Sequence, residues 1–171
     1  MKYLIVVDMQ NDFIDGALGS EMAREIVPCV AKKIDDCRGC VIFTRDTHGD
    51  DYLQTQEGRR LPVAHCIKGT PGHDICPELC HYAANAAAIV DKPTFGSTEL
   101  PRVIEHLGGD AEEIELCGLC TDICVISNAM LLKAAFPEAR LVVDHTCCAG
   151  VSRESHETAL AAMRAVQIDI I

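Results

Sequence analysis

Short, almost uninterrupted runs of apolar residues recur along the chain, separated by segments of helical length. Runs without polar alternation are typical of strands that are buried on both faces of a parallel sheet. The six runs are Tyr3 to Val7, Val41 to Thr44, Ala87 to Val90, Ile114 to Cys117, Leu141 to Val143 and Gln167 to Ile170. Helices are expected over Ser20 to Asp36, Pro77 to Ala84, Thr98 to Leu107, Asp122 to Ala135 and Ser152 to Ala165. This alternation predicts an α/β fold with helices on both sides of a parallel sheet.

The longest stretch without periodicity runs from Asp46 to His73 and contains four glycines. Loops of this length in compact domains are usually functional, although a disordered insertion is the alternative. The stretch begins just past a predicted strand end, where open α/β sheets place their ligands, so we expect it to form one wall of a pocket. No linker or repeat interrupts the pattern, so we expect residues 1–171 to form a single domain.

The overall charge of the chain limits the kinds of molecule that we expect it to bind. A net charge of −11 and a pI near 4.9 repel phosphate backbones and anionic lipid, so we expect neither nucleic acid nor membrane as a partner. No apolar stretch approaches the roughly 20 residues of a membrane span, and no signal sequence is evident. Eleven cysteines, an odd number without a secretion signal, argue against a disulfide framework and favour a reducing, cytoplasmic location.

Two Cys-X-X-Cys pairs, one from Cys37 to Cys40 and one from Cys117 to Cys120, offer a four-cysteine zinc site as an alternative use of these thiols. Cys40 opens one apolar run and Cys117 ends another, so we favour the interpretation that both are small buried apolar residues in or beside strands.

Three reactive side chains follow predicted strands. Asp8 ends the first apolar run, Lys92 follows the third, and Cys124 stands near the start of a helical segment after the fourth. Backbone N–H groups at a helix start favour a thiolate, and Thr121 and Asp122 are natural capping residues for that turn. Taken singly, an aspartate can cap a turn and a lysine can be solvated, but together an acid, a cation and a thiol suit a nucleophilic site.

Several motifs occur in an order that resembles one family. They are DMQNDF from Asp8, TRDTH from Thr44, HCIKGTPG from His65, DKPTF from Asp91, GLCTDICV from Gly118 and HETAL from His156. The chain resembles the isochorismatase-like cysteine hydrolases, the superfamily that includes nicotinamidases, over nearly its whole length. The resemblance implies a three-layer sandwich with a central six-stranded, mostly parallel sheet flanked by helices.

The same resemblance implies roles for the three reactive residues. Cys124 would attack an amide carbonyl and form a thioester, and Asp8 would move the proton from the thiol to the leaving ammonia. Lys92 would hold both side chains in place and lower the pKa of the cysteine. The oxyanion hole would consist of the backbone N–H groups of Cys120 and Cys124, with a cis peptide bond between Leu119 and Cys120.

The family's metal-binding pattern also has counterparts in the long loop. Asp46, His48 and His65 match an Asp-X-His pair and a later histidine, and Glu57 is the expected fourth ligand because Tyr52 occupies the place of the usual histidine. Carboxylate and imidazole ligands suit zinc, manganese or iron, with an open position for a pyridine nitrogen or water. The alternative is a metal-free loop that these histidines organise. We expect no organic cofactor.

The substrate is the least determined feature. Phe13 is expected to pack on a planar ring, but LPVAH before His65 lacks the aromatic residue of a ring sandwich, so Phe95 or Tyr52 would have to substitute. We expect an amidohydrolase that cleaves a small amide, nicotinamide first. The alternatives are an isochorismatase-type or N-carbamoyl/ureido amide hydrolase, or a catalytically idle binding subunit of the same fold. A homo-oligomer is expected.

Overall fold

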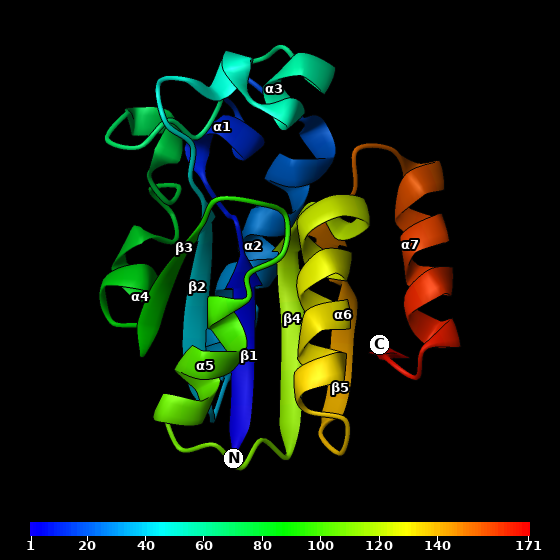
Figure 1. The fold of residues 1–171 in the computed structure, drawn as a ribbon. Coiled ribbons are helices and arrows are strands. Elements are labelled where there is room, and N and C mark those ends of the chain that lie inside the picture. Colours follow the sequence, from blue (N-terminus) through cyan, green and yellow to red (C-terminus); the bar gives the residue numbers. More distant parts are fainter.

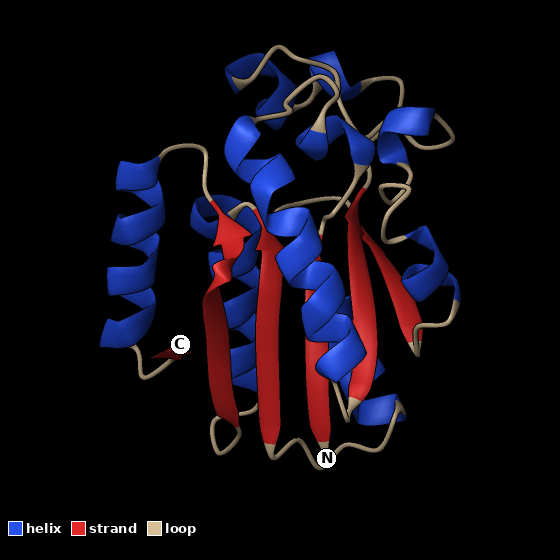
Figure 2. Ribbon diagram, turned by 180° about the vertical axis from the view of Figure 1, so that it is seen from behind, coloured by secondary structure: helices blue, strands red, loops and turns tan.

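A six-stranded sheet with only parallel pairings forms the centre of the computed structural model, which describes residues 1–171. The strands are β1 (Lys2–Val7), β2 (Cys40–Asp46), β3 (Ala88–Lys92), β4 (Glu113–Leu119), β5 (Arg140–Ala149) and β6 (Asp169–Ile170), in the order β3-β2-β1-β4-β5-β6. Helix α2 (Glu21–Asp36) lies over one face of the sheet, and α5 (Glu99–His106) and α6 (Ile126–Ala135) lie over the other (Figures 1 and 2). The predicted three-layer α/β sandwich is confirmed.

The remaining elements are short, except for the last helix. They are α1 (Asn11–Ile14), α3 (Gln56–Arg60), α4 (Cys80–Ala84), α7 (Arg153–Ala165) and the turns η1 (Tyr52–Gln54), η2 (Pro71–His73) and η3 (Thr121–Val125). The long loop of the sequence analysis contains η1, α3 and η2, and it folds over the carboxyl ends of the strands (Figure 1). Among all these helices, none has both the length and the apolar character needed to cross a membrane.

Local sequence explains the main elements. In β1, five consecutive residues from Tyr3 to Val7 are buried, as expected for a strand covered on both faces. Helix α2 buries residues at helical spacing, among them Ile26, Val30 and Ile34, and Ser20 caps it by accepting a hydrogen bond from the Ala23 N–H at 3.0 Å.

The two main differences from the predicted elements concern β5 and the start of α6. Strand β5 continues to Ala149, well past Val143, because its pairing with β4 resumes after an irregularity between Leu116 and Gly118. The polar residues at this point interrupt the apolar run, so the sequence pattern ended the strand too early. The helix expected from Asp122 begins instead as η3, a wider π-helical turn, before α6 follows.

The register of the strands brings distant residues to one edge. Val7 lies opposite Thr44 on one side and Gly118 on the other, and Asp46 lies opposite Lys92. The chain proceeds outward from β1 in both directions, which creates a switch point between β1 and β4. In open α/β sheets, ligands bind in the crevice outside the carboxyl ends of the strands at such a point.

Candidate active site

A cavity of about 330 Å³ lies at the carboxyl edge of the sheet. Seven of the ten predicted site residues line it, namely Phe13, Asp46, Glu57, His65, Phe95, Cys120 and Cys124. The other three, Asp8, Lys92 and His48, are buried beside these residues. Glu57, Leu61 and His65 belong to the long loop, so the prediction that this loop forms one wall of the pocket is confirmed.

Lys92 is the centre of a buried cluster of three reactive side chains. Its Nζ lies 2.6 Å from Asp8 Oδ2 and donates a hydrogen bond to Cys124 Sγ at 3.3 Å. Thr44 Oγ1 donates to the other oxygen of Asp8, Oδ1, at 2.7 Å. Asp8 and Lys92 are fully buried and Cys124 is 4% exposed. The three residues that the sequence placed after three different strands therefore lie together.

The charges of this cluster depend on each other. Burial is the main reason that the pKa of Asp8 is raised, and the nearby Lys92 charge only partly opposes it. Burial also disfavours the charged form of Lys92, but Asp8, Cys124 and Asp46 together outweigh burial and raise the pKa of the lysine. Lys92 is therefore a permanent cation, and Asp8 has the raised pKa that suits a group that must both accept and return a proton.

Lys92 lowers the pKa of Cys124, as expected, but its effect does not outweigh that of burial. Burial raises the pKa of this thiol well above its ordinary value, the charge of Asp8 raises it further, and Lys92 lowers it only in part. The sequence showed the cation and the helix start but not the complete enclosure of the sulfur. Burial thus favours the neutral thiol form of Cys124 over the thiolate.

The turn that contains Cys124 is held by the segment at the start of α7. Thr121 Oγ1 lies 2.8 Å from His156 Nδ1, and the carboxylate of Asp122 accepts hydrogen bonds from the Val151 N–H at 3.1 and 3.3 Å. Thr121 and Asp122 therefore anchor the turn to the segment at the start of α7. The sequence pattern indicated that these two residues cap the turn, but its N-cap is Cys120. The peptide bond between Leu119 and Cys120 is cis, as the family resemblance implied.

Gly118 permits the close approach of β4 to β1 beside Asp8. Its φ is +113°, and a Cβ atom at this position would lie 2.2 Å from the carbonyl oxygen of Val7. A side chain here would push Val7, and with it Asp8, away from Cys124.

The four predicted metal ligands also converge. Asp46, His48, Glu57 and His65 offer ligand atoms that all lie within 4.8 Å of one another. His48 Nε2 is 2.9 Å from Asp46 Oδ2, and His65 Nε2 is 3.4 Å from the same oxygen. Burial opposes the ionisation of Asp46, but these hydrogen bonds and the charge of Lys92 outweigh it and hold its pKa well below the ordinary value. Two imidazoles and two carboxylates fit a zinc-like divalent metal.

A second layer of contacts orients these ligands. His65 Nδ1 lies 2.8 Å from the carbonyl oxygen of Val63, which directs Nε2 of the ring toward Asp46. Tyr52 packs against His48 and His65 with ring centroids 4.6 and 4.9 Å apart and donates to the carbonyl oxygen of Leu61 at 3.0 Å. Tyr52 is 1% exposed and does not line the cavity, so the idea that it replaces the missing ring-binding aromatic is wrong.

Two side chains of the DMQNDF motif that the sequence pattern did not single out connect the end of β1 to the long loop. Gln10 is fully buried, donates to the carbonyl oxygens of Asp46 and His73 at 2.8 and 2.9 Å, and accepts from the Asp46 N–H at 2.7 Å. Asp12 accepts a hydrogen bond from the Cys66 N–H at 2.7 Å. Their position next to Asp8 in the motif was the available signal.

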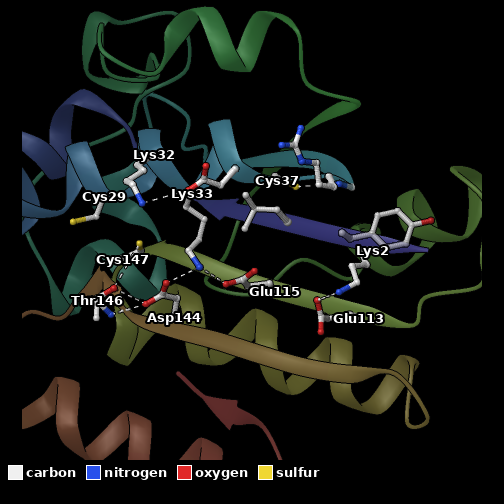
Figure 3. A pocket seen from close by; sticks show the side chains of 15 residues that line it. Lys2, Cys29, Lys32, Lys33, Cys37, Glu113, Glu115, Asp144, Thr146 and Cys147 are labelled. Atoms are coloured by element: carbon white, nitrogen blue, oxygen red, sulfur yellow. Dashed lines mark hydrogen bonds and ion pairs between the residues drawn. The ribbon is translucent and has the colours of Figure 1, made fainter.

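A larger groove of about 500 Å³ lies toward the amino ends of the strands, between α2 and β1, β4 and β5 (Figure 3). Lys33 reaches into it from α2 and forms ion pairs with Glu115 and Asp144, and Lys2 pairs with Glu113 at 2.9 Å. These charges already have partners, and no predicted site residue lines the groove. The smaller cavity at the opposite edge is therefore the candidate active site.

The remaining thiols and histidines form no second centre. The only group of three or more potential metal ligands is the Asp46 cluster, so the four-cysteine zinc alternative is wrong. All eleven cysteines are free. His73 is buried, and its Nε2 lies 2.8 Å from Thr47 Oγ1.

The fold and the site define the class of this protein: a parallel α/β sheet that carries a cysteine, a lysine and an aspartate together at its carboxyl edge. A family model described as the isochorismatase domain matches residues 2–171, and the chain belongs to the isochorismatase family. A nicotinamidase/pyrazinamidase of Mycobacterium tuberculosis is 31% identical over 189 residues, which cover all of this chain and 98% of the relative.

Solved structures of pyrazinamidases and nicotinamidases are also similar to this chain. The pyrazinamidase/nicotinamidase of Streptococcus mutans superposes with a TM-score of 0.83 at 28% identity, covering 100% of both chains. The pyrazinamidase of Pyrococcus horikoshii, solved in complex with zinc, superposes with a TM-score of 0.81 at 26% identity, covering 99% of this chain and 98% of its own.

Proposed function

We propose that this chain is an amidohydrolase that converts nicotinamide, or a closely similar neutral ring amide, into the carboxylic acid and ammonia. The observation that carries the proposal is the buried contact of Lys92 with both Asp8 and Cys124 behind a mostly apolar cavity. The relatives named nicotinamidase and pyrazinamidase support this choice of substrate class.

The reaction begins with a proton transfer. Asp8, whose Oδ2 lies 2.6 Å from Lys92 Nζ, accepts the proton of the Cys124 thiol. The thiolate then attacks the amide carbonyl carbon, and the N–H groups of Cys120 and Cys124 stabilise the resulting oxyanion. When the intermediate collapses, the C–N bond breaks, Asp8 gives its proton to the nitrogen, and ammonia leaves a thioester on Cys124.

Hydrolysis of the thioester returns the site to its starting state. Asp8, again a carboxylate, takes a proton from water as the water oxygen attacks the thioester carbonyl. The C–S bond breaks, and the departing sulfur of Cys124 recovers its proton from Asp8. Throughout the cycle, Lys92 stays protonated and offsets the single negative charge that moves between Asp8 and Cys124.

Asp46, His48, Glu57 and His65 are the residues that would hold a divalent metal, for which zinc is the first candidate. A bound metal would supply an electrophilic position for a pyridine nitrogen or a water molecule. Phe13 and Phe95 offer aromatic surface to a ring in the cavity. Phe13 packs against His65 with ring centroids 5.5 Å apart, which places ring-binding and metal-binding residues side by side.

The lining of the cavity separates the alternatives. It contains the carboxylates of Asp46 and Glu57 and no arginine or lysine side chain. Isochorismate and N-carbamoyl amino acids carry carboxylates, and such groups would find no arginine or lysine partner in this mostly apolar lining. A neutral amide needs no such partner. An idle binding subunit would have no need for the fully buried pair of Asp8 and Lys92, because such a pair is costly to desolvate.

An amide panel tests the proposal. Purified protein is incubated with nicotinamide, pyrazinamide, benzamide, an N-carbamoyl amino acid and isochorismate, and release of ammonia or pyruvate is measured. We expect the neutral ring amides to be hydrolysed with the highest kcat/KM, and Cys124→Ala to abolish the activity. Preference for an anionic substrate, or full activity of Cys124→Ala, contradicts the proposal.

A further inference from the structure

Asn128 is a buried amide on α6 that the reaction above does not use. It is 0% exposed, and its Nδ2 donates to the carbonyl oxygen of Cys124 at 2.8 Å and to that of Phe95 at 3.2 Å. Its Oδ1 accepts a hydrogen bond from the Ser97 N–H at 2.9 Å. One side chain thus connects the segment with the nucleophile to the loop that follows β3.

That loop contains two groups that matter to the site. Lys92 stands at its start and donates from Nζ to the Thr94 carbonyl oxygen at 3.2 Å, and Phe95 lines the cavity. The loop also packs closely on α6, because a Cβ atom at Gly96 would lie 2.7 Å from Leu131 Cδ1. The hydrogen bonds of Asn128 therefore determine how the loop sits against the helix that follows Cys124.

We infer that Asn128 is a positioning residue that fixes the position of the nucleophile relative to the substrate-contacting loop. The inference rests on the proposed amidase function. The bond to the Cys124 carbonyl acts on the nucleophile and therefore on kcat. The bonds to Phe95 and Ser97 act on the loop at the cavity and therefore on KM. A buried amide that satisfies three backbone groups on two segments is costly to replace, because each broken bond leaves a buried polar group without a partner.

The neighbouring residue shows how these two effects can be separated. Ser127 donates from its hydroxyl to the carbonyl oxygen of Ile123, four residues earlier, at 2.6 Å. A serine at position 128 can make the equivalent bond to Cys124, but it is too short to reach the loop. Serine and alanine have nearly the same volume, so the difference between Asn128→Ser and Asn128→Ala isolates the bond to Cys124.

The test compares these two variants with wild-type protein and with Asn85→Ala, an exposed asparagine that makes the same type of bond to the His81 carbonyl at 2.7 Å. We expect Asn128→Ala to lower kcat and raise KM, each by about tenfold, as a misplaced reacting group does. Asn128→Ser should recover kcat to within about threefold of wild type while KM stays raised. Asn85→Ala should leave both unchanged.

Alkylation of Cys124 by iodoacetamide, followed by mass spectrometry, provides a readout that does not depend on amidase activity. We expect slower labelling in Asn128→Ala than in Asn85→Ala, because the sulfur moves away from Lys92. Wild-type kinetics in a folded Asn128→Ala, or equal kcat losses in the alanine and serine variants, would overturn the inference. If Asn128→Ala does not fold, the KM of Asn128→Ser decides it. A wild-type protein without amidase activity contradicts the proposed function, and the labelling rates then decide the inference alone.

Discussion

Burial determines the chemistry of individual residues in this site more than their identity does. Cys124, Lys92 and Asp8 would each have an ordinary pKa in water, but the fold encloses them together and shifts the pKa of all three upward. One cation then faces two potential anions, and one proton has to be shared between the acid and the thiol. In the proposed mechanism, this coupling lets a proton pass between the acid and the thiol without a histidine.

Asp8→Asn tests the proton transfer. The amide keeps the shape of the carboxylate but cannot accept the thiol proton, so we expect kcat to fall by roughly 10²–10⁴-fold. Ammonia release from the best substrate is the measurement. Asp36→Asn, a surface change on α2, serves as the control and should retain full activity. Near-normal turnover of Asp8→Asn would mean that another group is the base, and His145 would be the first to examine.

Lys92→Met tests the electrostatic role of the lysine. Burial and Asp8 already raise the pKa of Cys124, and Lys92 is the nearby charge that lowers it. Removing the cation should raise this pKa further, so the pH profile of Cys124 alkylation should move to higher pH. Labelling rates measured across a pH series would show this. An unchanged profile, or one that moves to lower pH, would exclude the role.

At the scale of elements, the site exists because the carboxyl ends of four neighbouring strands lie at one edge of the sheet. Asp8, Asp46 and Lys92 lie at the carboxyl ends of β1, β2 and β3, and η3 with Cys124 follows β4. The irregularity in the pairing of β4 and β5 falls at Gly118, just before the turn that contains the nucleophile. Strand pairing therefore controls the distances within the reactive cluster, although the hydrogen bonds that hold it come from side chains.

Gly118→Ala tests this dependence. Alanine at a positive φ costs about 1–2 kcal/mol at any such position, and here the added Cβ also overlaps the Val7 carbonyl. Gly109→Ala is the matched control, because its φ is +73° and the nearest atom to an added Cβ is 3.6 Å away. Urea unfolding should show a larger loss for Gly118→Ala, and kcat should fall in that variant only. Equal stability losses with unchanged kcat in both variants would contradict the argument.

At the scale of the whole molecule, the long loop and the sheet form one site through Gln10, Asp12 and the proposed metal ligands. Gln10 and Asp12 hold the loop from the end of β1, and Asp46 belongs both to β2 and to the ligand cluster. A metal bound there would connect α3 and the loop to the sheet. The predicted homo-oligomer remains a prediction, which analytical ultracentrifugation can test.

Metal removal tests the role of the loop. We expect about one divalent ion per chain, the number for a single four-ligand site. Added zinc at 100 times its Kd should stabilise the chelator-treated protein by about 2.7 kcal/mol. Glu57→Ala should weaken binding, because it removes an anionic ligand, whereas the exposed Glu138→Ala should not. Elemental analysis and thermal unfolding provide the measurements. Protein without metal, with activity and unfolding indifferent to chelators, would refute the metal site and leave the catalytic proposal intact.

The sequence by itself determined the architecture and which side chains gather at the carboxyl edge of the sheet. Apolar runs such as Tyr3 to Val7 predict buried parallel strands because both faces of such strands must be covered. Asp8, Lys92 and Cys124 were predictable as a set because the carboxyl ends of parallel strands meet at one edge. The four candidate metal ligands came from the family pattern and from Glu57 as a substitute for a missing histidine.

Only the tertiary structure decided how burial shifts the pKa of Cys124, where β5 ends, and which hydrogen bonds Gln10, Thr121, Asp122 and Asn128 form. These features depend on contacts between segments far apart in the chain, such as Asp122 with Val151 and Asn128 with Ser97. The local sequence pattern shows which side chains favour a turn or a strand and which can carry a charge. It does not show how completely residues of other elements bury these side chains. That burial determines the pKa of each side chain and the partners available for its hydrogen bonds.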